Sequence, residues 1–273
     1  MSVVAIAETC GSEGTEIGRE LSRALGWEFA DREIIAKAAE RYGEAVMELH
    51  HVTEEKPTLW ERFSDSTRHY VSCVEATIFE MAVQGRAVLV GHGAAIMLRE
   101  VPHVFRVRVT APEPVRIRRV RDRQGLADEG AAGHLVRDTD HERASRMRFL
   151  YRVDLDDPLL YDLTLNSERL TLAEGVGLIR QALQSHIVEP TTRSLARAHD
   201  LSFAAQARAR LAVDPRTRRL RLAVNVVDGR LTIGGIVDSE EYRDVVLQLV
   251  GGIPGLVAVD NEIGVLPRRI AGT

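Results

Sequence analysis

Cysteine and lysine are both rare in this chain of 273 residues, which contains two of each. The cysteines, Cys10 and Cys73, are too few for a disulfide framework and lack the paired spacing of a zinc site. Because cytoplasmic thiols stay reduced, this scarcity favours a cytoplasmic protein. The lysines are Lys37 and Lys56, so a cationic site elsewhere in the chain must rely on arginine.

Long apolar runs are absent as well. No segment approaches the roughly 18 apolar residues that a membrane-spanning helix needs, so no transmembrane segment is expected. The apolar start of the chain is interrupted by Glu8 and has no basic region before it, unlike a signal peptide. The formal net charge of −4 gives no reason to expect nucleic acid as a partner.

Short apolar segments alternate with helical patterns along the first two thirds of the chain. The expected strands are 3–7, 27–30, 87–91, 103–110 and 161–166. The expected helices are 15–25, 31–42 with Asp31 as its cap, 67–84, one opened by Pro112 and Pro114, 131–151 and 171–185. This alternation predicts an α/β fold with a parallel sheet. The polar segment 43–66 is expected to form a mobile flap.

The loop after the first expected strand is rich in glycine. Its central residues are Gly11, Ser12, Glu13, Gly14 and Thr15. Glycines there allow backbone N–H groups to face phosphate oxygens at a helix N-terminus. In the register of the G-x-x-x-x-G-K-[ST] motif, Glu8 and Glu13 replace the two glycines and Gly14 replaces the lysine. Only Thr15 is retained, so an ordinary strand-to-helix turn is an equal alternative.

Arginine is concentrated in one segment: ten lie within residues 116–152, with no lysine. Arg116, Arg119 and Arg123 recur on one helical face, and Arg143 and Arg146 do so in the next helix. The planar guanidinium fork suits phosphate oxygens. Each arginine alone is consistent with a solvated helix face paired with acidic residues, but the cluster favours phosphate binding.

Several ordered motifs resemble the cytidylate kinase-like family. They are residues 11–21 (GSEGTEIGREL), 25–33 (LGWEFADRE), 87–94 (AVLVGHGA), 140–144 (DHERA), 157–158 (DP) and 161–166 (YDLTLN). The resemblance covers about residues 3–184. It implies a P-loop NTPase-like fold of the nucleoside monophosphate kinase type. It also implies transfer of the ATP γ-phosphoryl group to a nucleotide such as CMP.

The resemblance implies a role for each motif. Gly11, Ser12, Glu13, Gly14 and Thr15 would hold ATP, with Thr15 also at Mg²⁺. Asp31, Arg32, Gly91, His92 and Asp162 would face the acceptor nucleotide. Arg119, Arg137 and Arg143 would act as catalytic residues in a lid over the transferring phosphate.

Two departures from the family pattern leave other functions open. The loop has no lysine, and His92 stands where authentic cytidylate kinases have an arginine. A nucleotide-binding regulator with little or no catalysis is therefore an alternative to a kinase. A third alternative is an interaction protein that uses the kinase-like fold only as a scaffold.

The pattern changes after an expected linker at 189–199. Residues 200–267 read as helix, strand, strand, helix, strand, with a tight turn at Asp228 and Gly229. Residues 225–241 (NVVDGRLTIGGIVDSEE) and 253–261 (IPGLVAVDN) resemble a BON domain. That resemblance implies a binding module for a protein or phospholipid partner, or a homodimer contact; a small packing domain is the alternative. The expected domains are thus 1–188 and 200–267.

Overall fold

The computed structural model describes residues 2–43, 46, 65–185 and 188–267. By its contacts the chain divides into two compact units, each described here by itself. The first unit contains residues 1–31 and 84–191, and the second contains residues 32–83 and 192–273. None of the helices in the described ranges is long and apolar enough to cross a membrane.

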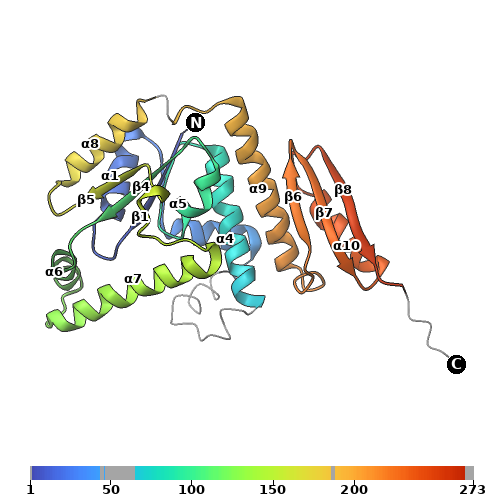
Figure 1. Cartoon of the computed structure of the whole chain (residues 1–273), viewed down its shortest axis with the longest axis horizontal. Coiled ribbons are helices and arrows are strands. Elements are labelled where there is room, and N and C mark those ends of the chain that lie inside the picture. The colour runs from blue at the N-terminus through green and yellow to red at the C-terminus, as the bar shows by residue number, and fades with distance from the viewer. Residues whose placement is uncertain (1, 44–45, 47–64, 186–187, 268–273) are drawn as a thin grey trace. The chain divides into compact units, whose positions relative to one another are not determined.

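The first unit is built on a five-stranded parallel sheet in the order β2-β3-β1-β4-β5 (Figure 1). The strands are β1 (Val3–Glu8), β2 (Glu28–Ala30), β3 (Ala87–Val90), β4 (Val104–Thr110) and β5 (Leu163–Asn166). Residues 3–6 of the central strand β1 are fully buried, as expected for an apolar strand covered on both faces. The predicted α/β fold with a parallel sheet is confirmed.

Helices α1 (Gly14–Leu25) and α8 (Leu172–Leu183) complete the main core of this unit. Ile17 and Leu21 of α1 pack with Ile6 of β1 and Ile179 of α8. Gly18 lets α1 approach the sheet closely, because a Cβ at this position would lie 2.7 Å from Val90. The glycine loop is thus fixed between a buried strand and a tightly packed helix.

Nine of the ten arginines lie on α6 (Glu113–Gln124) and α7 (Glu129–Tyr151), two helices that pack against each other, and Arg152 is the C-cap of α7. Val120 of α6 contacts Ala132 and Val136 of α7 in a small apolar cluster. Asp128 caps α7 by accepting hydrogen bonds from two backbone amides. Short helical turns α5 (Ala94–Met97), η2 (Leu98–Glu100) and η3 (Pro158–Leu160) were not expected from the sequence.

The prediction that Asp31 caps the following helix is wrong. Helix α2 (Glu33–Tyr42) has Arg32 at its N-cap, with no side-chain cap hydrogen bond. Asp31 Oδ1 lies 3.5 Å from His92 Nε2 instead. Its carboxylate thus contacts a residue that follows the neighbouring strand β3 rather than the first turn of α2. Of the expected flap at 43–66, residues 44–45 and 47–64 lie outside the described residues, and 65–66 belong to a helix.

In the part of the chain that the structure describes, the second unit combines three helices with a small α/β module. The helices are α2, α4 (Asp65–Gln84) and α9 (Thr192–Val213). The module contains β6 (Ala223–Val227), β7 (Arg230–Val237), α10 (Glu240–Gly251) and β8 (Ala258–Val265). Strand β7 pairs antiparallel with β6 and parallel with β8. The expected order of helix, strand, strand, helix, strand is confirmed.

Helix α9 begins earlier than the sequence predicts. Residues 192–199, expected in a linker, form its first two turns, because Ser194 and Ala198 are buried against neighbouring side chains. Further along, Arg208 of α9 lies 3.7 Å from Glu75 of α4. Residues 32–83 thus share a compact unit with 192–273, and the domain limits 1–188 and 200–267 stay a prediction.

Asp200 of α9 fixes the hairpin turn between β6 and β7. Its carboxylate accepts hydrogen bonds from the amides of Asp228 (3.0 Å) and Gly229 (2.8 Å), both of which have positive φ. Asp200→Ala leaves the two turn amides without their charged acceptor, so we expect the free energy of unfolding to fall by about 2 kcal/mol. Urea denaturation of the full chain measures this loss. The exposed Asp238→Ala is the control, and an equal effect of both variants contradicts this role of Asp200.

Candidate functional site

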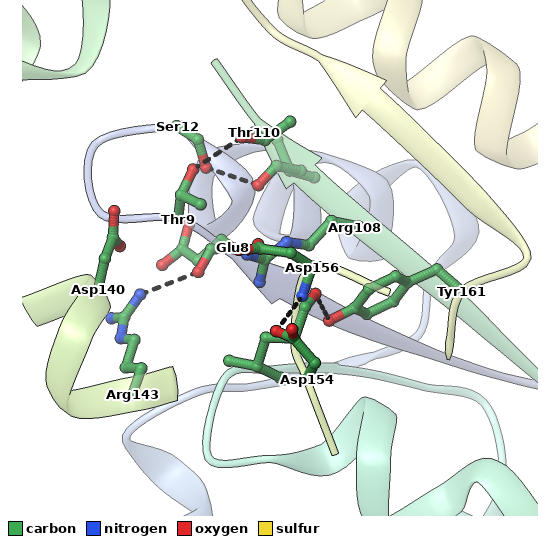
Figure 2. Close-up of polar contacts among 12 residues, drawn as sticks. Glu8, Thr9, Ser12, Arg108, Thr110, Asp140, Arg143, Asp154, Asp156 and Tyr161 are labelled. Carbon is green, nitrogen blue, oxygen red and sulfur yellow. Dashed lines mark hydrogen bonds and ion pairs between the residues drawn. The ribbon is translucent and has the colours of Figure 1, made fainter. Parts of the chain in front are cut away.

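The glycine loop curves over the carboxyl ends of β1 and β4. Ser12 is fully buried, and its Oγ donates to the carbonyl oxygen of Val109 at 3.0 Å. Thr9 Oγ1, just after β1, donates a hydrogen bond to Thr110 Oγ1 of β4 at 3.2 Å (Figure 2). Gly11 has φ 78°, and a Cβ there would lie 2.8 Å from the carbonyl oxygen of Arg116, so only glycine fits. The loop conformation is therefore fixed by the strands and by α6.

The side chain of Glu8 turns into the mouth of this loop. Its Oε2 accepts a hydrogen bond from the Thr15 amide at 2.9 Å, and its Oε1 accepts one from Thr15 Oγ1 at 3.1 Å. A Cβ on Gly14 would lie 2.7 Å from both Cβ and Oε2 of Glu8. In phosphate-binding loops the backbone amides face the phosphates and the Ser/Thr hydroxyl binds Mg²⁺. Here the Glu8 carboxylate binds both the amide and the hydroxyl of Thr15.

The charge state of Glu8 reflects opposing effects. Burial raises the pKa of this carboxyl group above its usual value, and the nearby Glu16 carboxylate adds to that rise. The positive charge of Arg143 and the two hydrogen bonds from Thr15 lower the pKa, but not enough to cancel the effect of burial. Arg143 from α7 points toward the end of β1 in Figure 2, where its Nη1 donates to the Glu8 carbonyl oxygen at 3.1 Å.

Arg116 and Asp140 hold the loop backbone rather than an open lid. The buried guanidinium of Arg116 donates to the carbonyl oxygens of Ala111 (2.9 Å) and Cys10 (3.0 Å) and to Asp140 Oδ2 (2.6 Å). Asp140 Oδ1 accepts from the Cys10 amide at 2.8 Å. Both polar groups of Cys10 are thus fixed by the helix pair, and burial raises the pKa of the Cys10 thiol.

Of the three predicted catalytic arginines, two contact the loop. Arg143 contacts Glu8, as described above. Arg119 lies 3.0 Å from the Glu13 carboxylate and donates to Ser167 Oγ (2.9 Å) and the Ser167 carbonyl oxygen (2.8 Å). Arg137 instead pairs with Glu113 at 2.8 Å, with both side chains about half exposed. That contact joins α7 to α6, so the place of Arg137 over a bound phosphate stays a prediction.

Three of the five predicted acceptor residues, Asp31, Gly91 and His92, lie at the carboxyl edge of the sheet. Gly91, His92 and Gly93 follow β3 with φ angles of 71°, 50° and 78°, and His92 meets Asp31, which follows the neighbouring strand β2. The structure thus brings three of the predicted acceptor residues, Asp31, Gly91 and His92, close together. Arg32 is exposed and begins the second compact unit, so its role stays a prediction.

Asp162 pairs with Arg106, a residue that the sequence motifs do not include. Its two carboxylate oxygens accept hydrogen bonds from Arg106 Nε (3.2 Å) and Nη2 (2.8 Å). Arg108, on the same face of β4, is buried over the Tyr161 ring and lies 3.4 Å from Asp156 Oδ1. Alternating arginines inside an otherwise apolar strand were the signal that was missed. Whether Asp162 reaches a nucleotide ribose stays a prediction.

Two parts of the chain match protein-family models. Residues 3–169 match the model of the cytidylate kinase-like family. The chain belongs to this family. Residues 199–267 match the model of the BON domain, which confirms the second resemblance.

Relatives of the cytidylate kinase-like domain share about a quarter to a third of its residues. The cytidylate kinase of Pyrobaculum arsenaticum is 30% identical over 179 residues, covering 64% of this chain and 89% of that protein. The cytidylate kinase of Methanosarcina barkeri is 26% identical over 180 residues, covering 64% and 92%. An uncharacterized protein from Eubacterium ventriosum of known structure is 16% identical, with a TM-score of 0.49 over 68% of this chain and all of that one.

Oxygen atoms suited to magnesium are present in the cytidylate kinase-like domain. Mg²⁺ prefers carboxylate, hydroxyl and phosphate oxygens, and two that are cis in its octahedral shell lie about 3 Å apart. Glu8 Oε1 and Thr15 Oγ1 are 3.1 Å apart, so the pair fits this cation. No cluster of three or more His, Cys, Asp or Glu side chains arranged for a metal occurs among the described residues.

Arg116→Met tests the scaffold of the cytidylate kinase-like domain. This change leaves the partly buried Asp140 carboxylate and the Cys10 carbonyl without their donor, so we expect a loss of about 2–4 kcal/mol in the free energy of unfolding. Chemical denaturation measures it. Arg118→Met, at an exposed position of the same helix, is the matched control. Equal stability of the two variants contradicts the structural role of Arg116.

Proposed function

We propose that the cytidylate kinase-like domain is a nucleotide kinase-like phosphotransferase, which moves the ATP γ-phosphoryl group to a nucleoside monophosphate such as CMP. The observation that supports it most is the convergence of Arg119 and Arg143 on the loop at the carboxyl edge of the sheet. In open α/β sheets, ligands bind at this edge. The cytidylate kinases among the relatives support the choice of acceptor.

The proposed roles follow from the needs of phosphoryl transfer, which depends on positioning and on stabilising negative charge. Backbone amides of Gly11, Ser12, Glu13, Gly14 and Thr15, at the N-terminus of α1, would hold the ATP phosphates. Arg119 and Arg143, with Arg137 from the lid, would stabilise the transferring group. Thr15 and Glu8 would hold Mg²⁺, which neutralises phosphate charge when bound.

On the acceptor side, Asp31, His92 and the Gly91 turn would position the acceptor nucleotide, together with Arg32 and Asp162. The Asp31–His92 pair and the Asp162–Arg106 pair already orient these side chains. A nucleoside monophosphate presents a phosphate oxygen as nucleophile, which needs alignment more than deprotonation. The site therefore needs no strong general base for the proposed reaction.

The absence of a lysine at position 14 of the loop favours a second function. Gly14 stands there, and the only lysines of the chain are Lys37 and Lys56, outside residues 1–31 and 84–191. Losing one preorganised donor to a transition-state charge costs about 10²–10³ in rate. A nucleotide-binding regulator with weak or no catalysis is the alternative that this observation supports.

A coupled assay with ATP, magnesium and a panel of nucleoside monophosphates separates these functions. Turnover with one acceptor, CMP first, supports the kinase. A saturable rise in melting temperature with ATP or CMP, without product, supports the regulator. Indifference to every nucleotide rejects both and leaves the scaffold alternative.

The BON domain is proposed as an interaction module for a partner protein or a phospholipid surface, or as a homodimer contact. Ile236 on β7 and Val227 on β6 are 66% and 55% exposed, which supports a binding surface on this module. We also propose a cytoplasmic location, consistent with free thiols at Cys10 and Cys73. Light scattering and vesicle co-sedimentation of the full chain distinguish self-association from lipid binding.

A further inference from the structure

We infer that Glu8 makes the loop selective for magnesium-bound phosphate ligands and against metal-free ones. The inference rests on the proposed function, because it concerns how a nucleotide phosphate enters the same loop. It assigns to Glu8 a role in ligand choice that the phosphate-binding motif, with glycine at this position, does not contain.

The Glu8 carboxylate already occupies both donors of Thr15, the amide and the hydroxyl. The would-be Cβ of Gly14 lies 2.7 Å from the Glu8 side chain, so the carboxylate fills the space in front of α1. The backbone of Glu8 is held within β1 and by Arg143, which leaves side-chain rotation as the way to clear the loop. An incoming phosphate must therefore displace or accommodate this carboxylate.

Charge also opposes a metal-free phosphate. Three arginines beside the loop are already paired with carboxylates: Arg116 with Asp140 (2.6 Å), Arg119 with Glu13 (3.0 Å) and Arg123 with Glu16 (2.8 Å). Arg143 donates to the Glu8 carbonyl oxygen at 3.1 Å, and its positive charge acts on the Glu8 carboxyl group. The positive charge of these arginines is thus already balanced by carboxylates. A metal-free triphosphate would bring several negative charges beside the partly buried Glu8 without any excess of positive charge, which is unfavourable at short range.

A divalent cation changes both the competition for the Thr15 donors and the balance of charge at the loop. It adds positive charge between the phosphate and the carboxylate, and the oxygens of Glu8 and Thr15 are spaced to serve as two of its ligands. Glu8 then changes from a competitor of the phosphate into part of its binding site. The ligand class is therefore a divalent metal complex of a nucleoside polyphosphate.

Isothermal titration of ATP into the full chain, in excess MgCl₂ or in EDTA, tests the inference. We expect the wild-type Kd to be at least about 10-fold weaker in EDTA, since one uncompensated like charge near a partly buried site is worth about 1.4 kcal/mol or more. In Glu8→Gln, which keeps the size and one acceptor oxygen, the two Kd values should agree within about 3-fold. Glu20→Gln, on the exposed side of α1, is the control and should behave as wild type.

The outcomes are distinct. An equal Kd with and without magnesium in the wild type, or an unchanged magnesium dependence in Glu8→Gln, overturns the inference while ATP binding stands. Failure of every folded variant to bind ATP in either condition rejects the proposed function and the inference with it. Glu8→Gly, which removes the carboxylate entirely, must also lose the magnesium dependence. Circular dichroism verifies that each variant is folded.

Discussion

Phosphoryl transfer by the double variant Glu8→Gly/Gly14→Lys is expected to exceed that of the wild type by about 10²-fold or more. This variant restores the first glycine and the lysine of the phosphate-binding motif together. Mg²⁺ would then be held by Thr15 and the nucleotide phosphates without Glu8, as in that motif. A positioned cation at the transferring phosphate contributes about that factor in related electrostatic sites. The measurement is kcat for ATP and CMP in a coupled assay.

The single variant Gly14→Lys should not show this gain. A Cβ at residue 14 would lie 2.7 Å from Glu8 Cβ, an atom close to the backbone that cannot move away easily. The new ammonium group would also pair with the Glu8 carboxylate instead of a phosphate. We therefore expect a stability loss of about 1–3 kcal/mol and no increase in rate.

The control is Gly177→Lys, because nothing lies within 4 Å of a Cβ at Gly177 on α8. It should leave stability and rate near their wild-type values. Additive effects of Glu8→Gly and Gly14→Lys would contradict a direct conflict between residues 8 and 14, since contacting residues are expected to couple.

Arg143→Ala is expected to weaken binding of magnesium–ATP by about 10- to 100-fold. Its guanidinium donates to the Glu8 carbonyl oxygen at 3.1 Å and its positive charge acts on the Glu8 carboxyl group, so it would face the proposed phosphate site. A charge-assisted hydrogen bond is worth about 1.5–3 kcal/mol, which corresponds to that range. The measurement is the Kd by titration calorimetry.

Arg137→Ala provides the comparison on the same helix. Arg137 is half exposed and pairs with Glu113, so its removal should change the Kd of ATP by less than about 3-fold. An effect on kcat alone would support its proposed place in the lid during catalysis. Equal losses of ATP affinity in the two variants would contradict the distinction between Arg143 at the loop and Arg137 on the helix pair.

Much of the fold could be predicted from the sequence because the signals are local. An uninterrupted apolar strand at residues 3–6, a glycine loop and a fourfold-spaced helix are sufficient to predict β1 and α1. The turn at Asp228 and Gly229 likewise predicts the hairpin of the BON domain. In each case the residues that determine the element are close together in the chain.

The features that depend on distant residues could not be predicted. The sequence placed Glu8 at the first glycine of the motif, but it did not indicate the hydrogen bonds of its side chain to Thr15 or the contact of its carbonyl oxygen with Arg143, 135 residues away. Helical spacing also treats Arg137 and Arg143 alike, whereas the packing of α6 on α7 decides which of them reaches the loop. The early start of α9 depends on tertiary burial of Ser194 and Ala198.

The central claim is that the backbone amides of residues 11–15 and the arginines beside them enclose an anionic phosphate. Amide chemical shifts of the ¹⁵N-labelled chain, followed during titration with magnesium–ATP, test it most directly. We predict saturable shifts of the Gly14 and Thr15 amides, with the Thr15 amide changing most as Glu8 yields its hydrogen bond. Nucleotide-independent spectra for both amides, at concentrations that saturate known ATP-binding proteins, would contradict the claim.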